Sequence, residues 1–193
     1  MSCIPGFLEF SRTVLRQALH GGGLAVDATL GNGRDAELLA GLAGPEGRVY
    51  CFDVQEPAIR RARARLAEAG LLDRVEIFHA GHETLADLLP ASALGRVRAA
   101  TFNLGFLPGS DRRVTTRPGT TLAALTALAP FMAPGGVVSV AVYTGHSGGL
   151  EEGEAVTAWC AALDPAVWRA ARYGQVNKRS SRETLFLLER LGA

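Results

Sequence analysis

The stretch that decides the fold of this sequence is DATLGNGRDA, residues 27–36. It closes a short apolar run over residues 24–29 and precedes a helical pattern over residues 34–42. Gly31 and Gly33 flank Asn32, so the backbone can turn sharply there and a ligand can come close to it. A glycine turn between a buried strand and a helix is typical of α/β sheets that bind a nucleotide or nucleoside, although such turns also occur without a ligand.

Outward from this stretch, apolar runs of strand length alternate with helical patterns along the chain. We expect strands at residues 24–29, 48–54, 75–78, 97–104 and 137–143, and helices at 7–19, 34–42, 56–69, 83–89, 120–132 and 151–163. Residues 167–173 and 184–189 predict a closing antiparallel hairpin. The alternation predicts one domain over residues 1–193, built as a Rossmann-like, doubly wound, seven-stranded and mostly parallel sheet with helices on both faces.

The composition is typical of a soluble globular chain with a nearly neutral charge. Apolar residues make up 48% of the 193 positions and the formal net charge is +1, so nucleic-acid binding would need a local basic patch. Cys3, Cys51 and Cys160 lie too far apart for a zinc motif or a disulfide framework, and we expect no metal. No apolar run reaches the ~20 residues of a membrane helix and the N-terminus lacks a signal-peptide pattern, so we expect a cytoplasmic location.

In parallel sheets, ligands bind beyond the carboxyl ends of the strands, and Asp53 ends the second predicted strand. It follows Gly33 by about 20 residues, the separation at which an acidic side chain accepts hydrogen bonds from ribose hydroxyls. The alternative is that Asp53 caps the helix that begins close to Pro57. Together with the glycine turn, the position favours ribose binding.

Asp27 and Asp35 distinguish between two kinds of cofactor that use this plan. A carboxylate just before the glycine turn would repel the pyrophosphate of a dinucleotide. Adenosylmethionine carries no phosphate, and its sulfonium and α-ammonium groups are cationic. The two carboxylates therefore favour S-adenosyl-L-methionine, although Thr29 replaces the first glycine of the usual methyltransferase signature.

The fourth predicted strand ends in Asn103-Leu104-Gly105-Phe106, where many methyltransferases place residues that bind the methyl acceptor. This segment partly resembles the (Asn/Asp)-Pro-Pro-(Tyr/Phe) motif of amino-methyltransferases, without its prolines. The Asn103 side-chain oxygen and the Leu104 carbonyl can accept hydrogen bonds from an amine and aim its lone pair at a methyl group. Phe106 can stack on a planar base. The alternative is that Asn103 only ties down a loop.

Five blocks of the chain resemble, in order, the YtqB-like putative rRNA methylases, a family of small bacterial class I methyltransferases. The blocks are DATLGNGRDAELLA, FDVQEPAI, FNLGFLPGSDRRVTTRP, VAVYTGHSGGLEE and the terminal pattern over residues 177–189. The resemblance implies an adenosylmethionine-dependent enzyme that methylates the amine of 5-aminomethyl-(2-thio)uridine at the wobble position of tRNA. After Asn177 the chain reads KRSSRET, where the family often has a proline-rich stretch.

The resemblance and the strand ends together predict three groups of site residues. For the cofactor we expect Asp27, Thr29, Gly31, Asn32, Gly33, Asp35, Asp53, Gln55, His82, Asn103 and Gly105. For the substrate we expect Phe106, Pro108, Gly109, Tyr143 and Asn177. For catalysis we expect Asn103, Asp111 and His146.

Methyl transfer from a sulfonium is an in-line displacement that requires no metal, so catalysis should rest on positioning and on charge stabilisation. An alkylamine is mostly protonated near neutral pH and must lose a proton before it can attack. Asp111 and His146, in polar loops after strand ends, are candidates to accept that proton. The alternatives are a salt bridge between Asp111 and a neighbouring arginine, and a backbone contact for His146. His82 fits better beside the adenine ring.

Two local clusters of basic side chains are suited to binding a tRNA partner at its anticodon region. They are Arg112, Arg113 and Arg117 after the acceptor segment, and Lys178, Arg179 and Arg182 near the last hairpin. If both groups border one cleft, they can contact backbone phosphates. A methyltransferase acting on rRNA or on a small amine, a nicotinamide-dependent oxidoreductase and a binding module without turnover are the alternatives, and a homodimer stays open.

Overall fold

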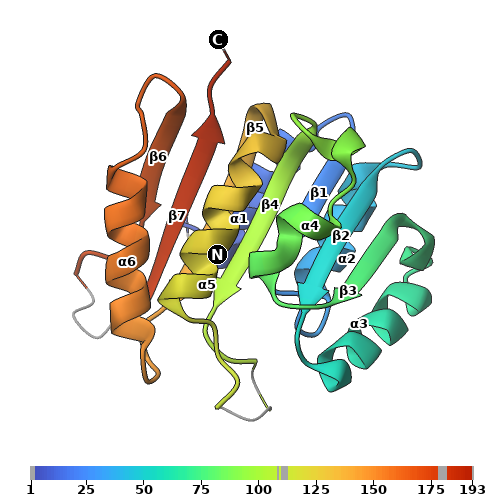
Figure 1. The fold of residues 1–193 in the computed structure, drawn as a ribbon, viewed down its shortest axis with the longest axis horizontal. Coiled ribbons are helices and arrows are strands. Elements are labelled where there is room, and N and C mark those ends of the chain that lie inside the picture. The colour runs from blue at the N-terminus through green and yellow to red at the C-terminus, as the bar shows by residue number, and fades with distance from the viewer. Residues whose placement is uncertain (1–2, 108, 110–112, 178–181, 193) are drawn as a thin grey trace.

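The computed structural model describes residues 3–107, 109, 113–177 and 182–192 and contains one seven-stranded sheet in the order β3-β2-β1-β4-β5-β7-β6 (Figure 1). The strands are β1 (Leu24–Asp27), β2 (Arg48–Asp53), β3 (Val75–His79), β4 (Val97–Leu104), β5 (Met132–Tyr143), β6 (Trp168–Tyr173) and β7 (Glu183–Arg190). Strands β1 to β5 pair in parallel, whereas β7 is antiparallel to both β5 and β6. The predicted doubly wound sheet with antiparallel last strands is confirmed.

Helices cover both faces of the sheet. The α-helices are α1 (Phe7–Ala18), α2 (Arg34–Ala43), α3 (Glu56–Glu68), α4 (Leu85–Leu88), α5 (Pro118–Leu128) and α6 (Gly149–Ala161). Short 3₁₀ turns lie at η1 (Leu72–Arg74), η2 (His82–Thr84), η3 (Ala91–Ala93) and η4 (Ala129–Phe131). Buried side chains of α1, α2 and α3 pack on one face, and those of α4, α5 and α6 on the other.

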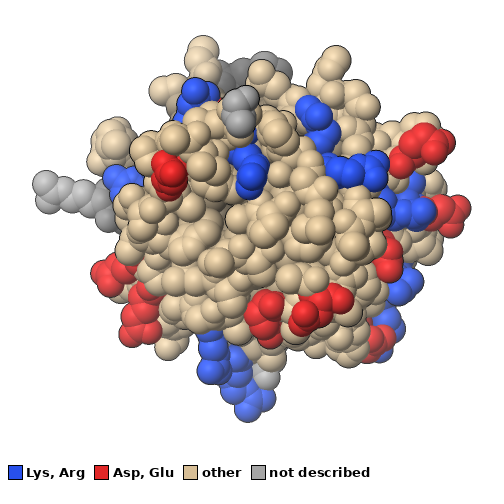
Figure 2. Space-filling model, turned by 45° about the horizontal axis from the view of Figure 1, so that its top comes forward, with Lys and Arg blue, Asp and Glu red and all other residues tan. Residues whose placement is uncertain are grey.

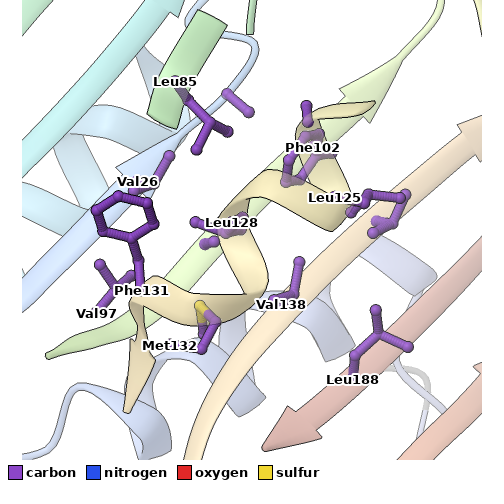
Figure 3. Packing of buried hydrophobic residues seen from close by; sticks show 14 of the residues in the cluster. Val26, Leu85, Val97, Phe102, Leu125, Leu128, Phe131, Met132, Val138 and Leu188 are labelled. Atoms are coloured by element: carbon purple, nitrogen blue, oxygen red, sulfur yellow. The ribbon is translucent and has the colours of Figure 1, made fainter. Parts of the chain in front are cut away.

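Alternation along the strands explains the two cores. In β1, Val26 belongs to the core under α4–α6 while its neighbour Ala25 belongs to the core under α1–α3. Figure 3 shows Leu128 of α5 and Phe131, just beyond that helix, directed into the same core as Val26. Each such large apolar side chain stabilises the fold by roughly 1.5–3 kcal/mol on burial, so the sheet is a rigid support for the loops at its edge.

The expected boundary between the fifth helix and the fifth strand was wrong. We predicted a helix through residue 132 and a strand from residue 137, because Pro134 and two glycines read as a helix stop. The helix instead ends at Leu128, and β5 already begins at Met132. The pairing of β4 with β5 shifts register between Val97 and Ala99, and Pro134 and Gly135 are exposed there. The proline therefore lies in a bulge, where its missing N–H costs no ladder hydrogen bond.

The carboxyl ends of the parallel strands lie together at the lower edge of the sheet in Figure 1, where the loop after β4 also emerges. This arrangement brings residues that are far apart in the sequence to one edge. Among the described residues, no helix combines the length and apolar character needed to cross a lipid bilayer.

Candidate functional site

Two cavities at the carboxyl edge of the sheet share one wall. The first cavity, of about 320 Å³, lies at the ends of β1, β2 and β3, and the second cavity, of about 410 Å³, lies at the ends of β1, β4 and β5 beside α1. The shared wall is formed by Thr29, Gly31, Asn103, Gly105, Phe106 and Leu107. Four of these were predicted as cofactor residues and Phe106 as a substrate residue, and the structure brings them together.

The glycine turn after β1 is shaped by two close contacts. Gly31 and Gly33 have φ values of +51° and +76°, which other residues rarely adopt. A Cβ on Gly33 would lie 2.9 Å from the Cβ of Ala62 on α3, and a Cβ on Gly31 would lie 3.1 Å from Leu107. A side chain at position 33 would clash with α3, and one at position 31 would press on the Leu107 side chain, so the positive φ and the packing favour glycine at both positions.

Asn32, at the tip of this turn, is tied to α3. Its Oδ1 accepts a hydrogen bond from Arg61 Nε at 2.8 Å, and its backbone oxygen accepts one from Arg65 Nε at 3.1 Å. Asn32 also lines the second cavity. Its predicted contact with the cofactor stays a prediction, and the side-chain oxygen already has a partner within the protein.

Asp53 ends β2 and faces the first cavity with both carboxylate oxygens held by backbone groups. Oδ2 accepts a hydrogen bond from Gly31 N and Oδ1 accepts one from Gln55 N, each at 2.8 Å. The N-cap of α3 is Gln55, so the alternative that Asp53 occupies the cap position is wrong. Each oxygen keeps a further lone pair, and the fixed carboxylate can accept hydrogen bonds from two adjacent hydroxyls.

Asp27 is a buried carboxylate at the end of β1 and borders the second cavity. Only 1% of the residue is exposed. Its Oδ1 accepts a hydrogen bond from Thr29 N at 3.2 Å, while Oδ2 makes no well-formed hydrogen bond in the part of the chain that the structure describes, although the buried Thr101 hydroxyl is close enough to the carboxyl to act on its pKa. Burial, with the nearby negative charge of Asp35, raises the pKa of Asp27 to about 8. A buried acid in this state is stabilised by a proton or by a cation.

We expect Asp27→Asn to remove a pH-dependent loss of stability. The pKa of Asp27 is raised from 3.8 to about 8 in the folded protein, so the native state binds the proton more tightly than the unfolded chain. The stabilisation that the proton on Asp27 gives the native state is fully present below pH 3.8 and is lost as the pH rises to about 8. The free energy of unfolding of the wild type, relative to Asp27→Asn, should therefore fall by about 2–3 kcal/mol between about pH 6 and pH 9.

Urea denaturation at the two pH values measures this difference. Asp87→Asn on α4 is the matched control, because it removes an exposed carboxylate, and its difference from the wild type should not change with pH. Parallel pH responses of the wild type and Asp27→Asn would contradict the burial argument.

Asn103 is held in a defined orientation at the shared wall. Its Nδ2 donates to Asp35 Oδ2 at 2.8 Å, and its backbone N donates to Thr29 Oγ1 at 2.7 Å. Because a carboxylate only accepts, this contact fixes which end of the amide carries the NH₂ group. Within the described residues, Asn103 Oδ1 has no partner and remains an acceptor. The alternative role, tying down a loop, explains the hydrogen bond that the amide nitrogen donates to Asp35. It does not use the amide oxygen, which can therefore accept from a ligand.

Arg12 on α1 completes this group and was not predicted from the sequence. Its Nη2 lies 3.5 Å from Asp35 Oδ1, and the residue lines the second cavity. In the sequence, Arg12 is one polar position of an amphipathic helix, far from the glycine turn. Only the packing of α1 across the sheet brings it to the site, so no local signal identifies it.

His82 lines the first cavity, and its predicted place beside the adenine ring stays a prediction. Its Nδ1 lies 3.1 Å from the Ala28 carbonyl oxygen, and its Nε2 is buried without a partner among the described residues. The carbonyl only accepts, so Nδ1 carries the proton and Nε2 is an acceptor. Burial lowers the pKa of His82 and keeps the ring neutral.

His146 lies in the wall of the second cavity between two glycines. Its Nδ1 lies 2.9 Å from the Ser147 carbonyl oxygen, and its Nε2 is buried without a partner in the described part of the chain. A Cβ on Gly105 would lie 3.2 Å from Nε2, and one on Gly149 would lie 2.9 Å from it. The backbone contact named as the alternative for His146 is present. The imidazole must rotate before Nε2 can take a proton from a group in the cavity.

Two aromatic side chains border the acceptor side. The ring of Phe106 lies edge-on to that of His146, with centroids 5.9 Å apart, and Phe106 lines both cavities. Tyr143 packs edge-on against Phe7 at 5.6 Å and lines the second cavity. Burial, with the charge of Asp35, raises the pKa of Tyr143 to about 12, so its hydroxyl stays protonated and can donate.

Three described residues that were predicted for the site, Gly33, Gly109 and Asn177, line neither cavity. Pro108 and Asp111 lie outside the described residues. Gly109 and Asn177 are exposed in connections after β4 and β6, and neither lines the first or the second cavity. Their predicted substrate and catalytic roles stay predictions.

The residues present fit a cofactor of the adenosylmethionine type. Asp53 offers a fixed carboxylate for a ribose diol, and the buried Oδ2 of Asp27 suits a cationic group. The two cavities adjoin at the shared wall, so the two features lie in neighbouring cavities. The described residues contain no group of three or more His, Cys, Asp or Glu side chains placed to hold a metal ion.

Comparisons with known proteins agree with this assignment of the cofactor. The family described as Putative rRNA methylase matches residues 49–189. The tRNA (mnm(5)s(2)U34)-methyltransferase, chloroplastic, of Arabidopsis thaliana is 34% identical over 190 residues, which cover 94% of this chain and 69% of the relative.

Two solved structures match over nearly their whole length. The putative rRNA-methylase from Clostridium thermocellum has a TM-score of 0.93 and 33% identity, covering 98% of this chain and all of that one. A putative methyltransferase from Streptococcus mutans in complex with SAH has a TM-score of 0.86 and 33% identity, covering 97% of this chain and 99% of that one.

Proposed function

Because the chain belongs to the putative rRNA methylase family and is an adenosylmethionine-dependent methyltransferase, we propose that it methylates RNA at the aminomethyl group of a wobble uridine in tRNA. The observation that carries this proposal is the orientation of Asn103, whose amide oxygen is left as an acceptor at the wall between the two cavities. The name of the Arabidopsis relative, which specifies a modified U34 of tRNA, supports the same target.

Residues of the two cavities would hold the cofactor at its two ends. Asp53 and the backbone of the glycine turn would hold the ribose, and Asp27 with Asp35 would face the cationic end. Adenosylmethionine supplies, when bound, a methyl group on a positively charged sulfur. Asp27, with its pKa raised to about 8, would release its proton more readily beside such a cation.

The acceptor segment, residues 103–106, would hold the amine. Asn103 Oδ1 and the Leu104 carbonyl can accept the two hydrogens of a neutral primary amine, which leaves the nitrogen lone pair free for attack. An ordinary alkylammonium has a pKa of about 10, so a group in the site must remove its proton or select the neutral form. His146 can act as this base after rotation of its ring, and Asp111 remains a second candidate.

Basic side chains near the cavities would contact the RNA backbone. Arg117 lines the first cavity, Arg12 lines the second, and the Arg182 side chain lies 3.2 Å from where a Cβ on Gly145 would be, next to His146 in the sequence. Figure 2 brings the upper edge of Figure 1 forward, away from the site, and on that face acidic and basic side chains are interspersed around a broad uncharged area. We expect the affinity for RNA to depend on arginines at the edge of the site.

Label transfer from methyl-labelled adenosylmethionine tests the proposal. The purified protein is given tRNA that bears 5-aminomethyluridine, the same tRNA with unmodified uridine, ribosomal RNA, or a small alkylamine. We expect label only in the first acceptor. Label in the small amine with none in tRNA would refute the RNA substrate, and label in unmodified tRNA or ribosomal RNA would place the target elsewhere in RNA.

A further inference from the structure

A buried carboxylate, Glu152, lies behind the acceptor segment and is not explained by cofactor binding. It is on α6 and 1% exposed. Its two oxygens each accept a hydroxyl hydrogen, from Thr116 at 2.7 Å and from Thr121 at 2.6 Å. Within the described residues no lysine or arginine pairs with it. A carboxylate buried without a cation depends on such hydrogen bonds, so both hydroxyl hydrogens are held toward Glu152.

This contact fixes the direction of the Thr116 hydroxyl. A hydroxyl has one hydrogen, and Thr116 donates it to Glu152, so only lone pairs remain for its other neighbour. That neighbour is Gly105, whose backbone N donates to Thr116 Oγ1 at 2.7 Å. Thr116 N in turn donates to the Gly105 oxygen at 3.1 Å. Glu152, Thr116 and Gly105 therefore form a chain of hydrogen bonds with a single direction.

Gly105 is the point at which this chain reaches the acceptor segment. Its φ is +130°, and a Cβ there would lie 3.2 Å from His146 Nε2. It directly follows Leu104 and Asn103, which carry the carbonyl and the amide oxygen assigned to the amine. A shift of Gly105 would therefore move both acceptors and the contact with His146 together.

We propose that Thr116, with its hydroxyl oriented by the buried carboxylate of Glu152, is a positioning residue for the methyl acceptor. It holds Gly105 so that the Asn103 and Leu104 oxygens present the acceptor amine at the distance and angle needed for attack. The inference rests on the acceptor role proposed for Asn103. Thr116 itself donates to no substrate atom, because its one hydrogen is committed to Glu152.

The test compares three variants in steady-state methylation of tRNA bearing 5-aminomethyluridine. Thr116→Val keeps the shape and removes the hydroxyl, and we expect it to lower kcat by about 10- to 100-fold, with KM for tRNA and Kd for adenosylmethionine within about twofold of the wild type. Thr116→Ser restores a hydroxyl and should keep kcat within about threefold of the wild type.

Thr121→Val is the matched control, because it removes the same kind of hydrogen bond from the same carboxylate without touching Gly105. It should destabilise the protein to a degree similar to Thr116→Val in thermal unfolding yet leave kcat within about threefold. Equal losses of kcat in the two valine variants, or no loss in Thr116→Val, would overturn the inference. If the wild type itself does not methylate this tRNA, the proposed function fails instead, so the two failures are distinct.

Discussion

Replacing Asn103 by alanine should lower kcat by about 10²-fold or more while adenosylmethionine still binds. The substitution removes the amide oxygen that would accept a hydrogen from the amine and leaves Asp53 and the glycine turn intact. The backbone hydrogen bond from residue 103 to Thr29 Oγ1 does not depend on the side chain, so the end of β4 should stay in place. Single-turnover methyl transfer and calorimetric titration with adenosylmethionine measure the two effects separately.

The variant Asn103→Asp is a second test of the role of this side chain. It keeps an acceptor oxygen but loses the donor to Asp35 and places two carboxylates side by side, so we expect activity to stay low. If Asn103→Ala retained kcat within about threefold of the wild type, Asn103 would be a loop anchor and the assignment of the acceptor segment would be wrong.

Replacing Asp53 by alanine should weaken adenosylmethionine binding by about 10²-fold. The variant loses the carboxylate that would bind the ribose and also loses the acceptors for Gly31 N and Gln55 N. Hydrogen bonds to a charged group contribute about 1.5–3 kcal/mol each, which is about 10- to 150-fold in affinity. Calorimetric titration gives the dissociation constant directly.

Asp164→Ala is the matched control for this prediction. Asp164 Oδ1 accepts a hydrogen bond from Ala166 N at 2.8 Å, the same two-residue contact that Asp53 makes to Gln55 N, but Asp164 borders neither cavity. It should leave the dissociation constant unchanged. An affinity of Asp53→Ala within about threefold of the control would show that the ribose is bound elsewhere.

The sequence predicted the parts of the site that depend on strand ends. The bounds of β4 agree with the expected residues 97–104, and Asp53 and Asn103 lie at strand ends as expected. These predictions succeed because a short apolar run in the local sequence indicates both a buried strand and the residue at which that strand ends. The start of β5 was missed because a proline followed by two glycines occurs both where a helix ends and where a strand bulges. Pro134 lies in a bulge of β5.

The contacts between distant elements could not be predicted in the same way. Arg12 reaches the site only through the packing of α1 on the sheet, and nothing in its local sequence marks it. Thr116 and Glu152 lie within two of the blocks that resemble the family, but their hydrogen bond joins the connection before α5 to α6 and could not be predicted from either block. His146 was identified as a residue type suited to proton transfer. The position of its Nε2 depends on Gly105 after β4 and on Gly149 at the start of α6, which leave room for the ring.

The most direct test of the central claim is mass spectrometry of nucleosides from tRNA that bears 5-aminomethyl-2-thiouridine, digested after reaction with the protein and adenosylmethionine. We predict that the aminomethyl nucleoside is converted to the methylaminomethyl nucleoside by the wild type, and more slowly by Asn103→Ala, by about 10²-fold or more. An unchanged wobble nucleoside, or a methyl group found on any other nucleoside of the tRNA, would contradict the account.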